Sequence, residues 1–276
     1  MKKSVMILLV VFLISFGVSS SAAETDSRDS IEIPVFMYHD VLENPRRWGE
    51  YCISPAAFEA DLQYFKDNGY STIVAQDLID YVKHGKPLPE KPVVLTFDDG
   101  YYNNVYYAEP LLAKYNMQAI IFVNGQFCEQ STVENAVNPN YSYVLWDELR
   151  EMHKRGVWDV QSHSWGLHSY TKGRNGATRR RGETEEEYSK MMADDCARIS
   201  AAIELFTGRK PVAFAYPYGS ANRESEQQLR ANGIGITFQS YQRMATFRQG
   251  DAASLSLVTR FLRSDKKSAE MWLRSV

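Results

Sequence analysis

Two adjacent carboxylates, Asp98 and Asp99, follow a short apolar run and precede Gly100. The run, Val93 to Phe97, is rich in β-branched residues and predicts a buried strand. Neighbouring strand residues point to opposite faces, so both carboxylates can serve one site only if the chain bends, which Gly100 permits. Crowded carboxylates repel unless a cation or a shared proton compensates. The pattern predicts a metal site or acid–base chemistry, although Asp-Asp-Gly also forms ordinary turns.

Histidines follow two other predicted strands. His39 follows the apolar run from Ile31 to Tyr38, and His163 lies just after the run from Val157 to Gln161, with His168 five residues later. Two imidazoles and one carboxylate are the ligand set of an open zinc site that keeps one position for water. Such water has a pKa lowered to about 7, and a second carboxylate could accept its proton. The spacing of the two later histidines does not match one helix face and predicts a loop.

Strands alternate with helices along the whole chain after the N-terminal segment. This order predicts parallel strands with helices outside, and about seven such units favour a distorted (β/α)7-type barrel, an α/β fold, over an open sheet. The active site of such a barrel lies at the C-terminal face of its strands. Helices are predicted at residues 55–68, 76–84, 101–115, 146–153, 184–206 and 225–232. Residues 124–141 are predicted to form a surface loop, and Leu255 to Phe261 the last strand.

The N-terminal segment has the composition of a signal peptide. Lys2 and Lys3 precede an apolar run from Val5 to Val18, and small residues lead to a predicted cleavage after Ala23. The run is short for a bilayer span, although an uncleaved anchor is the alternative. We therefore predict a signal peptide at 1–23, a polar tether at 24–30 and one catalytic domain at 31–276. The predicted location is secreted or on the extracellular cell surface.

Charge and cysteine content limit the partners. Without residues 1–23 the chain has 29 basic and 34 acidic residues, a net charge of −5, which argues against nucleic-acid binding. A neutral or partly cationic partner such as a glycan fits better.

Cys52, Cys128 and Cys196 are widely spaced and form no zinc knuckle. An oxidising exterior would allow one disulfide, and three buried thiols are the alternative.

Four blocks of sequence together resemble the polysaccharide deacetylases, carbohydrate esterase family 4, over residues 31–263. The blocks are Pro34–His39, Thr96–Gly100, Ser162–Trp165 with His168, and Tyr216–Gly219. The resemblance implies a distorted barrel that removes N-acetyl groups, or less often O-acetyl groups, from sugars.

The resemblance also implies roles for residues. Asp98 would be the catalytic base, and Asp99, His163 and His168 would bind a divalent metal, zinc first, with cobalt or another divalent ion as alternatives. The backbone N–H of Tyr218 would stabilise the oxyanion. Apart from the resemblance, the aromatic residues near the predicted site suit sugar rings, with simple packing as the alternative: Tyr101, Tyr102, Trp165 and Tyr218.

Three positions depart from the family pattern. Leu167 adds one residue between the metal-binding histidines, Ala215 stands where the family has an arginine that orients the base, and Arg260 stands where it has a general-acid histidine. A guanidinium cannot donate a proton at neutral pH. We therefore expect Arg260 to orient Asp98 as a third catalytic residue, with the proton coming from bound water or from Asp98.

Two other functions remain open at this stage. A catalytically impaired relative could bind glycan in the same cleft, and a hydrolase of this fold could act on a non-sugar amide. The expected partner is an acetylated polysaccharide or cell-wall glycan, with no nucleic acid, and with membrane contact only through an uncleaved signal peptide. Peptidoglycan, poly-N-acetylglucosamine, chitin oligomers and acetylated xylan are all candidate substrates.

Overall fold

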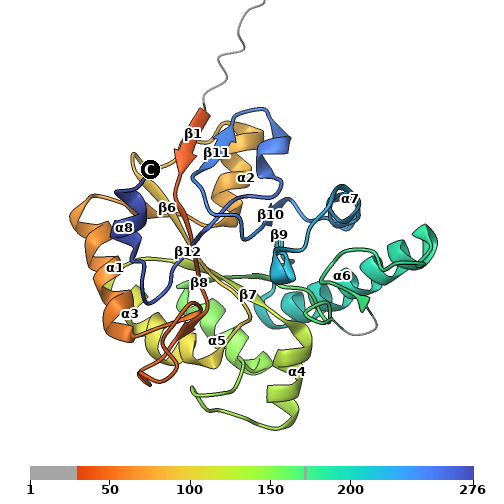
Figure 1. Cartoon of the computed structure of the whole chain (residues 1–276), viewed down its shortest axis with the longest axis horizontal. Helices are drawn as coiled ribbons and strands as arrows, with labels where there is room; N and C mark the ends of the chain where they lie inside the picture. Colours follow the sequence, from red (N-terminus) through yellow and green to blue (C-terminus); the bar gives the residue numbers. More distant parts are fainter. Residues whose placement is uncertain (1–29, 171–172) are drawn as a thin grey trace, which may run out of the picture.

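The computed structural model describes residues 30–170 and 173–276, and a curled parallel sheet forms its centre. The sheet has the strand order β10-β9-β8-β7-β6-β2-β12 (Figure 1), and each neighbouring pair is parallel. Its strands are β2 (Val35–Tyr38), β6 (Pro92–Phe97), β7 (Ala119–Val123), β8 (Trp158–Ser162), β9 (Ala213–Ala215), β10 (Ile236–Phe238) and β12 (Phe261–Leu262). The predicted barrel-type α/β fold is confirmed. The predicted signal peptide at 1–23 and the tether up to residue 29 lie outside the described residues.

Helices surround this sheet (Figure 1). They are α1 (Pro55–Asp67), α2 (Ala75–His84), α3 (Glu109–Tyr115), α4 (Gly125–Val133), α5 (Trp146–Arg155), α6 (Glu185–Thr207), α7 (Arg223–Ala231) and α8 (Ala269–Leu273). Shorter helical turns are η1 (Asn104–Ala108), η3 (Pro217–Gly219) and η4 (Ala252–Leu255). In the described part of the chain, no helix is long and apolar enough to span a bilayer.

Small strands complete the architecture. β1 (Ser30–Ile33) pairs antiparallel with β11 (Ala245–Arg248), β3 (Asp40–Val41) pairs with β4 (Cys52–Ile53), and β5 (Ser71–Thr72) adds to β6. The predicted strand from Ile31 to Tyr38 is therefore two strands in different sheets, because Pro34 interrupts it.

One irregular segment joins the two edges of the central sheet. Val258 forms a parallel bridge with Phe238 at the end of β10, and Phe261 pairs with Phe36 of β2. The single strand predicted from Leu255 to Phe261 was wrong, because the segment passes from one edge strand to the other. Leu257 in this segment has a φ of 53°, a left-handed conformation that a regular strand does not contain. The barrel thus closes through a bent connection.

Side-chain alternation along the strands separates two cores. Outward residues such as Phe97 and Ile121 pack against helices α1, α3, α5 and α6. Inward residues such as Val94, Ile120 and Phe122 pack with α2 and with the β1–β11 pair. The inner core therefore fills the interior below the C-terminal ends of the strands, and leaves those ends for polar residues.

Helix α4 lies inside the predicted loop at residues 124–141. Asn124 caps it, since its Oδ1 accepts from the N–H of Phe127 at 3.2 Å. The prediction of a loop was wrong because this helix buries only Gly125, Cys128 and Ser131, and so has a polar sequence. The structure also adds β11 and α8, which were not predicted.

The three cysteines are buried free thiols. Of the two predictions from the sequence, three buried thiols and one disulfide, the structure agrees with the three buried thiols.

Candidate active site

Strand alternation carries three reactive side chains to the same end of the barrel. Asp98 continues the inward row of Val94 and Thr96 on β6. His39 follows β2 and His163 follows β8 in the same inward sense, and all three line one cavity. The C-terminal ends of the parallel strands thus define the candidate site, as the sequence predicted.

A bend after β6 turns Asp99 toward the same cavity. Asp99 has a φ of 71° and Gly100 a φ of 73°. A Cβ added at Gly100 would lie 3.1 Å from Cγ1 of Val123, so a glycine fits best there. A regular strand would direct Asp99 away from Asp98. The predicted bend is present, and it begins at the aspartate itself.

Asp99, His163 and His168 form a compact cluster of metal-ligand atoms. Oδ1 of Asp99 lies 3.4 Å from Nε2 of His163 and 3.2 Å from Nε2 of His168. This oxygen is buried and accepts no well-directed hydrogen bond. The ligand atoms of the cluster lie within 4.8 Å of one another. Ligands bound to one tetrahedral zinc ion at about 2.0–2.1 Å are about 3.3 Å apart, so the cluster fits a divalent ion.

The orientation of His163 supports the same conclusion. Its Nδ1 lies 2.8 Å from the carbonyl oxygen of Ala215, which can only accept a hydrogen bond. Nδ1 therefore carries a proton, and Nε2 is the ring nitrogen that faces Asp99 and is placed to bind an ion. A histidine that donates its other ring N–H to a carbonyl is a common arrangement in metal sites.

Arg260 holds the second carboxylate. Its guanidinium donates to both oxygens of Asp98, at 2.7 and 2.8 Å, and both residues are buried. The same side chain donates to the hydroxyl of Thr96 at 3.1 Å and to the carbonyl of Gln239 at 3.0 Å. Arg260 is thus fixed on three sides and presents its planar end to Asp98.

The pKa values in the site reflect opposing effects. Burial raises the pKa of Asp98, but the charge of Arg260 and its hydrogen bonds outweigh burial and hold that pKa below the usual value. Burial also raises the pKa of Asp99, and the neighbouring His163 and His168 hold it well below its usual range. Burial lowers the pKa of His163, but Asp99 and Asp98 outweigh burial and hold that pKa above its usual value. Two ionised carboxylates and a raised pKa at His163 describe a cavity whose field favours a cation.

The cavity above the cluster has a volume of about 510 Å³. Tyr101 and Tyr218 line it, whereas Tyr102 does not, and Trp165 is buried in stacking contact with Trp146. The expected aromatic contribution of Tyr102 and Trp165 to the cavity is therefore wrong. Other lining residues are Met37, His39, Glu50, Tyr51, Tyr216, Gly219, Ser240, Gln242 and Leu262.

Tyr218 occupies the cavity rim. Its backbone has a φ of 59°, a conformation that is rare outside glycine and that recurs at functional sites. Its ring stacks on Tyr170 with centroids 4.2 Å apart and lies 4.4 Å from the ring of His168. The turn of η3 therefore places the residue beside the metal-ligand cluster.

His39 is a candidate functional residue to which the sequence analysis assigned no role. Its ring lines the cavity, and its Nδ1 has no hydrogen-bond partner among the described residues. Burial lowers its pKa, while the charges of Asp98 and Asp99 raise it. Its position in the sequence could have indicated a place in the cavity, because His39 is two residues beyond Met37 and therefore faces inward on the same side of β2.

The sequence of the chain matches a known family. The model of the polysaccharide deacetylase family matches residues 85–236, more than half of the chain. The chain therefore belongs to the polysaccharide deacetylase family.

Individual relatives agree with this assignment. A poly-beta-1,6-N-acetyl-D-glucosamine N-deacetylase of Escherichia coli K12 is 23% identical over 80% of this chain. The match spans only 36% of the length of that relative. A de-N-acetylase structure from Aggregatibacter actinomycetemcomitans is 26% identical and covers 89% of this chain and all of its own, with a TM-score of 0.72. The structure of IcaB from Ammonifex degensii is 28% identical and covers 88% of this chain and 95% of its own, with a TM-score of 0.69.

Proposed function

We propose that this protein is a secreted, metal-dependent polysaccharide N-deacetylase that releases acetate from N-acetylglucosamine units. The observation that carries the proposal is the cluster of Asp99, His163 and His168 beside an Asp98 carboxylate paired with Arg260 in one cavity. The E. coli relative named for poly-β-1,6-N-acetylglucosamine makes that polymer the first candidate substrate.

Each residue of the cluster has a distinct part in this proposal. Asp99, His163 and His168 would hold the divalent ion, with zinc first. A bound divalent ion supplies Lewis acidity toward the acetyl carbonyl and lowers the pKa of water. Asp98 accepts the proton of the attacking water, and its lowered pKa keeps it ionised and ready as a base at neutral pH.

Arg260 positions Asp98 for this role. A guanidinium that donates two parallel hydrogen bonds fixes both the plane and the direction of a carboxylate. Ala215, which stands where the family has an orienting arginine, contributes only its carbonyl, to His163. The chain thus supplies the arginine from the segment that closes the barrel.

Charge stabilisation and proton return involve the two remaining residues. The backbone N–H of Tyr218 would donate to the oxygen on which negative charge develops. His39, which lines the cavity near both aspartates, is the candidate that we add, beside bound water and Asp98, for the donor of the proton that the departing amine needs. Burial lowers the pKa of His39, so this role requires the charges of Asp98 and Asp99 to keep its ring protonated.

The shape of the cavity suits a sugar. Its volume of about 510 Å³ lies within the range of sites that bind small ligands. Tyr51 and Tyr218 are 51% and 39% exposed at its edge, so their rings are available to contact the faces of sugar rings. A secreted location rests on the composition of residues 1–23 alone.

Acetate release from defined polymers tests the proposal. Purified residues 24–276 would be supplied with zinc or cobalt and with poly-β-1,6-N-acetylglucosamine, chitin oligomers, peptidoglycan or acetylated xylan. We expect acetate from an N-acetylglucosamine polymer, and loss of release with a chelator. Binding of glycan with stoichiometric metal and no acetate from any polymer would instead support a non-catalytic binding protein.

A further inference from the structure

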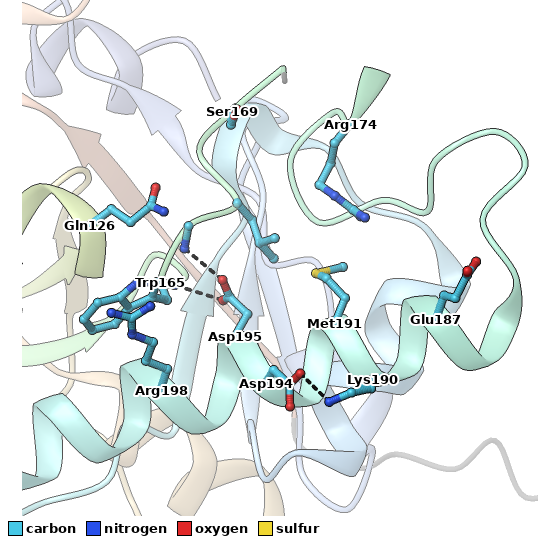
Figure 2. Close-up of a pocket in the computed structure, with 12 residues that line it drawn as sticks. Gln126, Trp165, Ser169, Arg174, Glu187, Lys190, Met191, Asp194, Asp195 and Arg198 are labelled. Atoms are coloured by element: carbon cyan, nitrogen blue, oxygen red, sulfur yellow. Dashed lines mark hydrogen bonds and ion pairs between the residues drawn. The ribbon is translucent and has the colours of Figure 1, made fainter. Parts of the chain in front are cut away.

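Asp195 of α6 contacts the loop that joins the two histidines of the cluster. Its Oδ1 accepts from the N–H of Trp165 at 2.9 Å, and its Oδ2 accepts from the N–H of Gly166 at 2.8 Å (Figure 2). Both oxygens of one carboxylate thus bind two consecutive peptide groups between His163 and His168. Figure 2 shows Asp195 pointing from the helix into this loop, whereas its neighbour Asp194 points toward Lys190.

The other hydrogen bonds of this loop are local or reach α4. Ser164 donates to the hydroxyl of Ser162 at 3.1 Å, and Leu167 donates to the hydroxyl of Ser164 at 3.0 Å. The carbonyls of Ser164 and Trp165 accept from the first turn of α4, at 3.0 and 2.8 Å. The loop is therefore held between the start of α4 on one side and Asp195 on the other.

Packing on the α4 side leaves the loop little freedom. A Cβ at Gly125 would lie 2.4 Å from the ring of Trp165, so the ring sits directly on the backbone of α4. The guanidinium of Arg198 lies over the ring of Trp165, 3.8 Å from the ring centroid. Any shift of the loop would have to break these contacts or the two hydrogen bonds to Asp195.

Asp195 is half-buried, and no ion pair to it is found in residues 30–170 and 173–276. Burial raises its pKa to about 6, even though two peptide N–H groups donate to it. A hollow of about 660 Å³ lies between the loop and α6 beside it and includes none of the three candidate metal ligands. An apolar side chain at this position would leave the N–H groups of Trp165 and Gly166 without this acceptor, so the carboxylate serves to hold the loop.

We infer that Asp195 is a positioning residue that fixes the loop between His163 and His168 and thereby sets the place of His168 in the metal site. The inference rests on the metal site proposed above. His163 is held by its strand and by Ala215, and its side chain is 3% exposed. The side chain of His168 is 22% exposed and follows a loop with one residue more than the family pattern. His168 therefore depends on the anchoring of the loop.

Metal affinity tests the inference directly. We would measure zinc binding by competition with a chromophoric chelator, and the absorption spectrum of the cobalt form, for Asp195→Ala and Asp195→Asn. Loss of a residue that holds a metal ligand in place typically lowers metal affinity by about 10–100-fold. We expect a loss in this range for Asp195→Ala, with an altered cobalt spectrum. Asp195→Asn keeps one acceptor, so its loss should be smaller.

Two variants of the same helix serve as controls. Asp194→Asn removes an exposed carboxylate that pairs only with Lys190 on the surface, and should bind zinc as the wild type does. Ile203→Ala creates a cavity in the core near the C-terminal end of α6 and should lower the melting temperature without changing zinc affinity.

Each outcome decides between explanations. Wild-type affinity and an unchanged cobalt spectrum in a folded Asp195→Ala protein would overturn the inference. An equal loss of affinity in Ile203→Ala would assign the effect to general destabilisation and would also overturn it. Failure of the wild type to bind any divalent ion would overturn the proposed metal site, and with it this role of Asp195. This outcome differs from the others because the wild type and all variants would then behave alike.

Discussion

Arg260 donates two parallel hydrogen bonds to Asp98, at 2.7 and 2.8 Å, although the two residues are 162 positions apart in the sequence. The arginine comes from the segment that joins β10 to β12, and the aspartate from the end of β6. The candidate base is therefore oriented only once the barrel has closed.

Replacement of Arg260 should reduce turnover more than substrate affinity. Lysine carries the charge but cannot form the fork, so we expect Arg260→Lys to lower kcat about 100-fold through loss of orientation. Arg243→Lys, an exposed change on the same connection, should leave kcat unchanged. Steady-state kinetics with a soluble oligomer measure both, and wild-type kcat in Arg260→Lys would remove the orienting role.

Arg260→Met probes the stability of the same pair. It leaves the Asp98 carboxylate buried and unpaired, which typically destabilises a protein by about 3–5 kcal/mol. Urea unfolding should show this loss, and Asp98→Asn combined with Arg260→Met should recover part of it. No recovery in the double variant would show that the two residues do not act as a pair.

Metal removal should affect both activity and stability. Chelation should abolish acetate release, and zinc at about 100 times its dissociation constant should raise the free energy of unfolding by about 3 kcal/mol. His168→Ala should lose most of this gain, because it removes one ligand of the cluster. His84→Ala, an exposed change in α2, is the matched control and should keep the full gain. Thermal unfolding with and without zinc measures this gain. Equal stabilisation of both variants by zinc would show that the ion binds elsewhere.

The role of His39 predicts a separation of chemistry from metal binding. His39→Gln should lower kcat by about 10²–10⁴, the range that general acid–base catalysis contributes, because the amine would leave without a proton donor. Zinc affinity should stay at the wild-type value, since His39 is outside the ligand cluster. Turnover and isothermal titration of the same preparation test this. A wild-type kcat would assign proton donation to another group.

The raised pKa of Asp195 predicts a pH-dependent stability difference. The folded protein keeps a proton on this carboxyl up to a pH of about 6, whereas the unfolded chain releases it near the ordinary value of 3.8. The contribution of this proton to the free energy of unfolding is fully present below pH 3.8, the ordinary pKa of the carboxyl. This contribution is lost as the pH rises through about 6. Asp195→Asn has no such proton, so the wild type should lose up to about 3 kcal/mol relative to this variant between those limits. Urea unfolding in chelator over this range measures the difference, and a constant difference would contradict the expectation.

Local sequence rules were sufficient for much of the site. The apolar run before Asp98, the turn at Gly100 and the histidine after β8 each mark the end of a parallel strand, and such ends meet at one face. The capping box of Thr184 and Glu187 likewise begins α6, as expected. These features depend on residues near one another in the chain, which is why they could be predicted.

Other features depend on contacts between distant segments. The pair of Arg260 with Asp98 requires closure of the barrel. The segment of Arg260 was predicted as one strand because apolar and β-branched residues recur along residues 255–261. Asp195 lies next to the buried Met192, Cys196 and Ile199 of α6, where periodicity predicts core rather than an anchor for a loop 29 residues away. Helix α4 was missed because it packs few apolar residues. Tertiary contacts, not local propensity, determine these three features.

The most direct test of the central claim compares the wild type with Asp98→Asn in one preparation. Both would be loaded with zinc, their metal content measured, and acetate release from poly-β-1,6-N-acetylglucosamine followed. Because Asp98 is the proposed base and not a ligand, the variant should bind one zinc ion and lose about 10²–10⁴-fold in kcat. Full acetate release by the zinc-loaded variant would contradict the account, because the proton of the attacking water would then go to a different group.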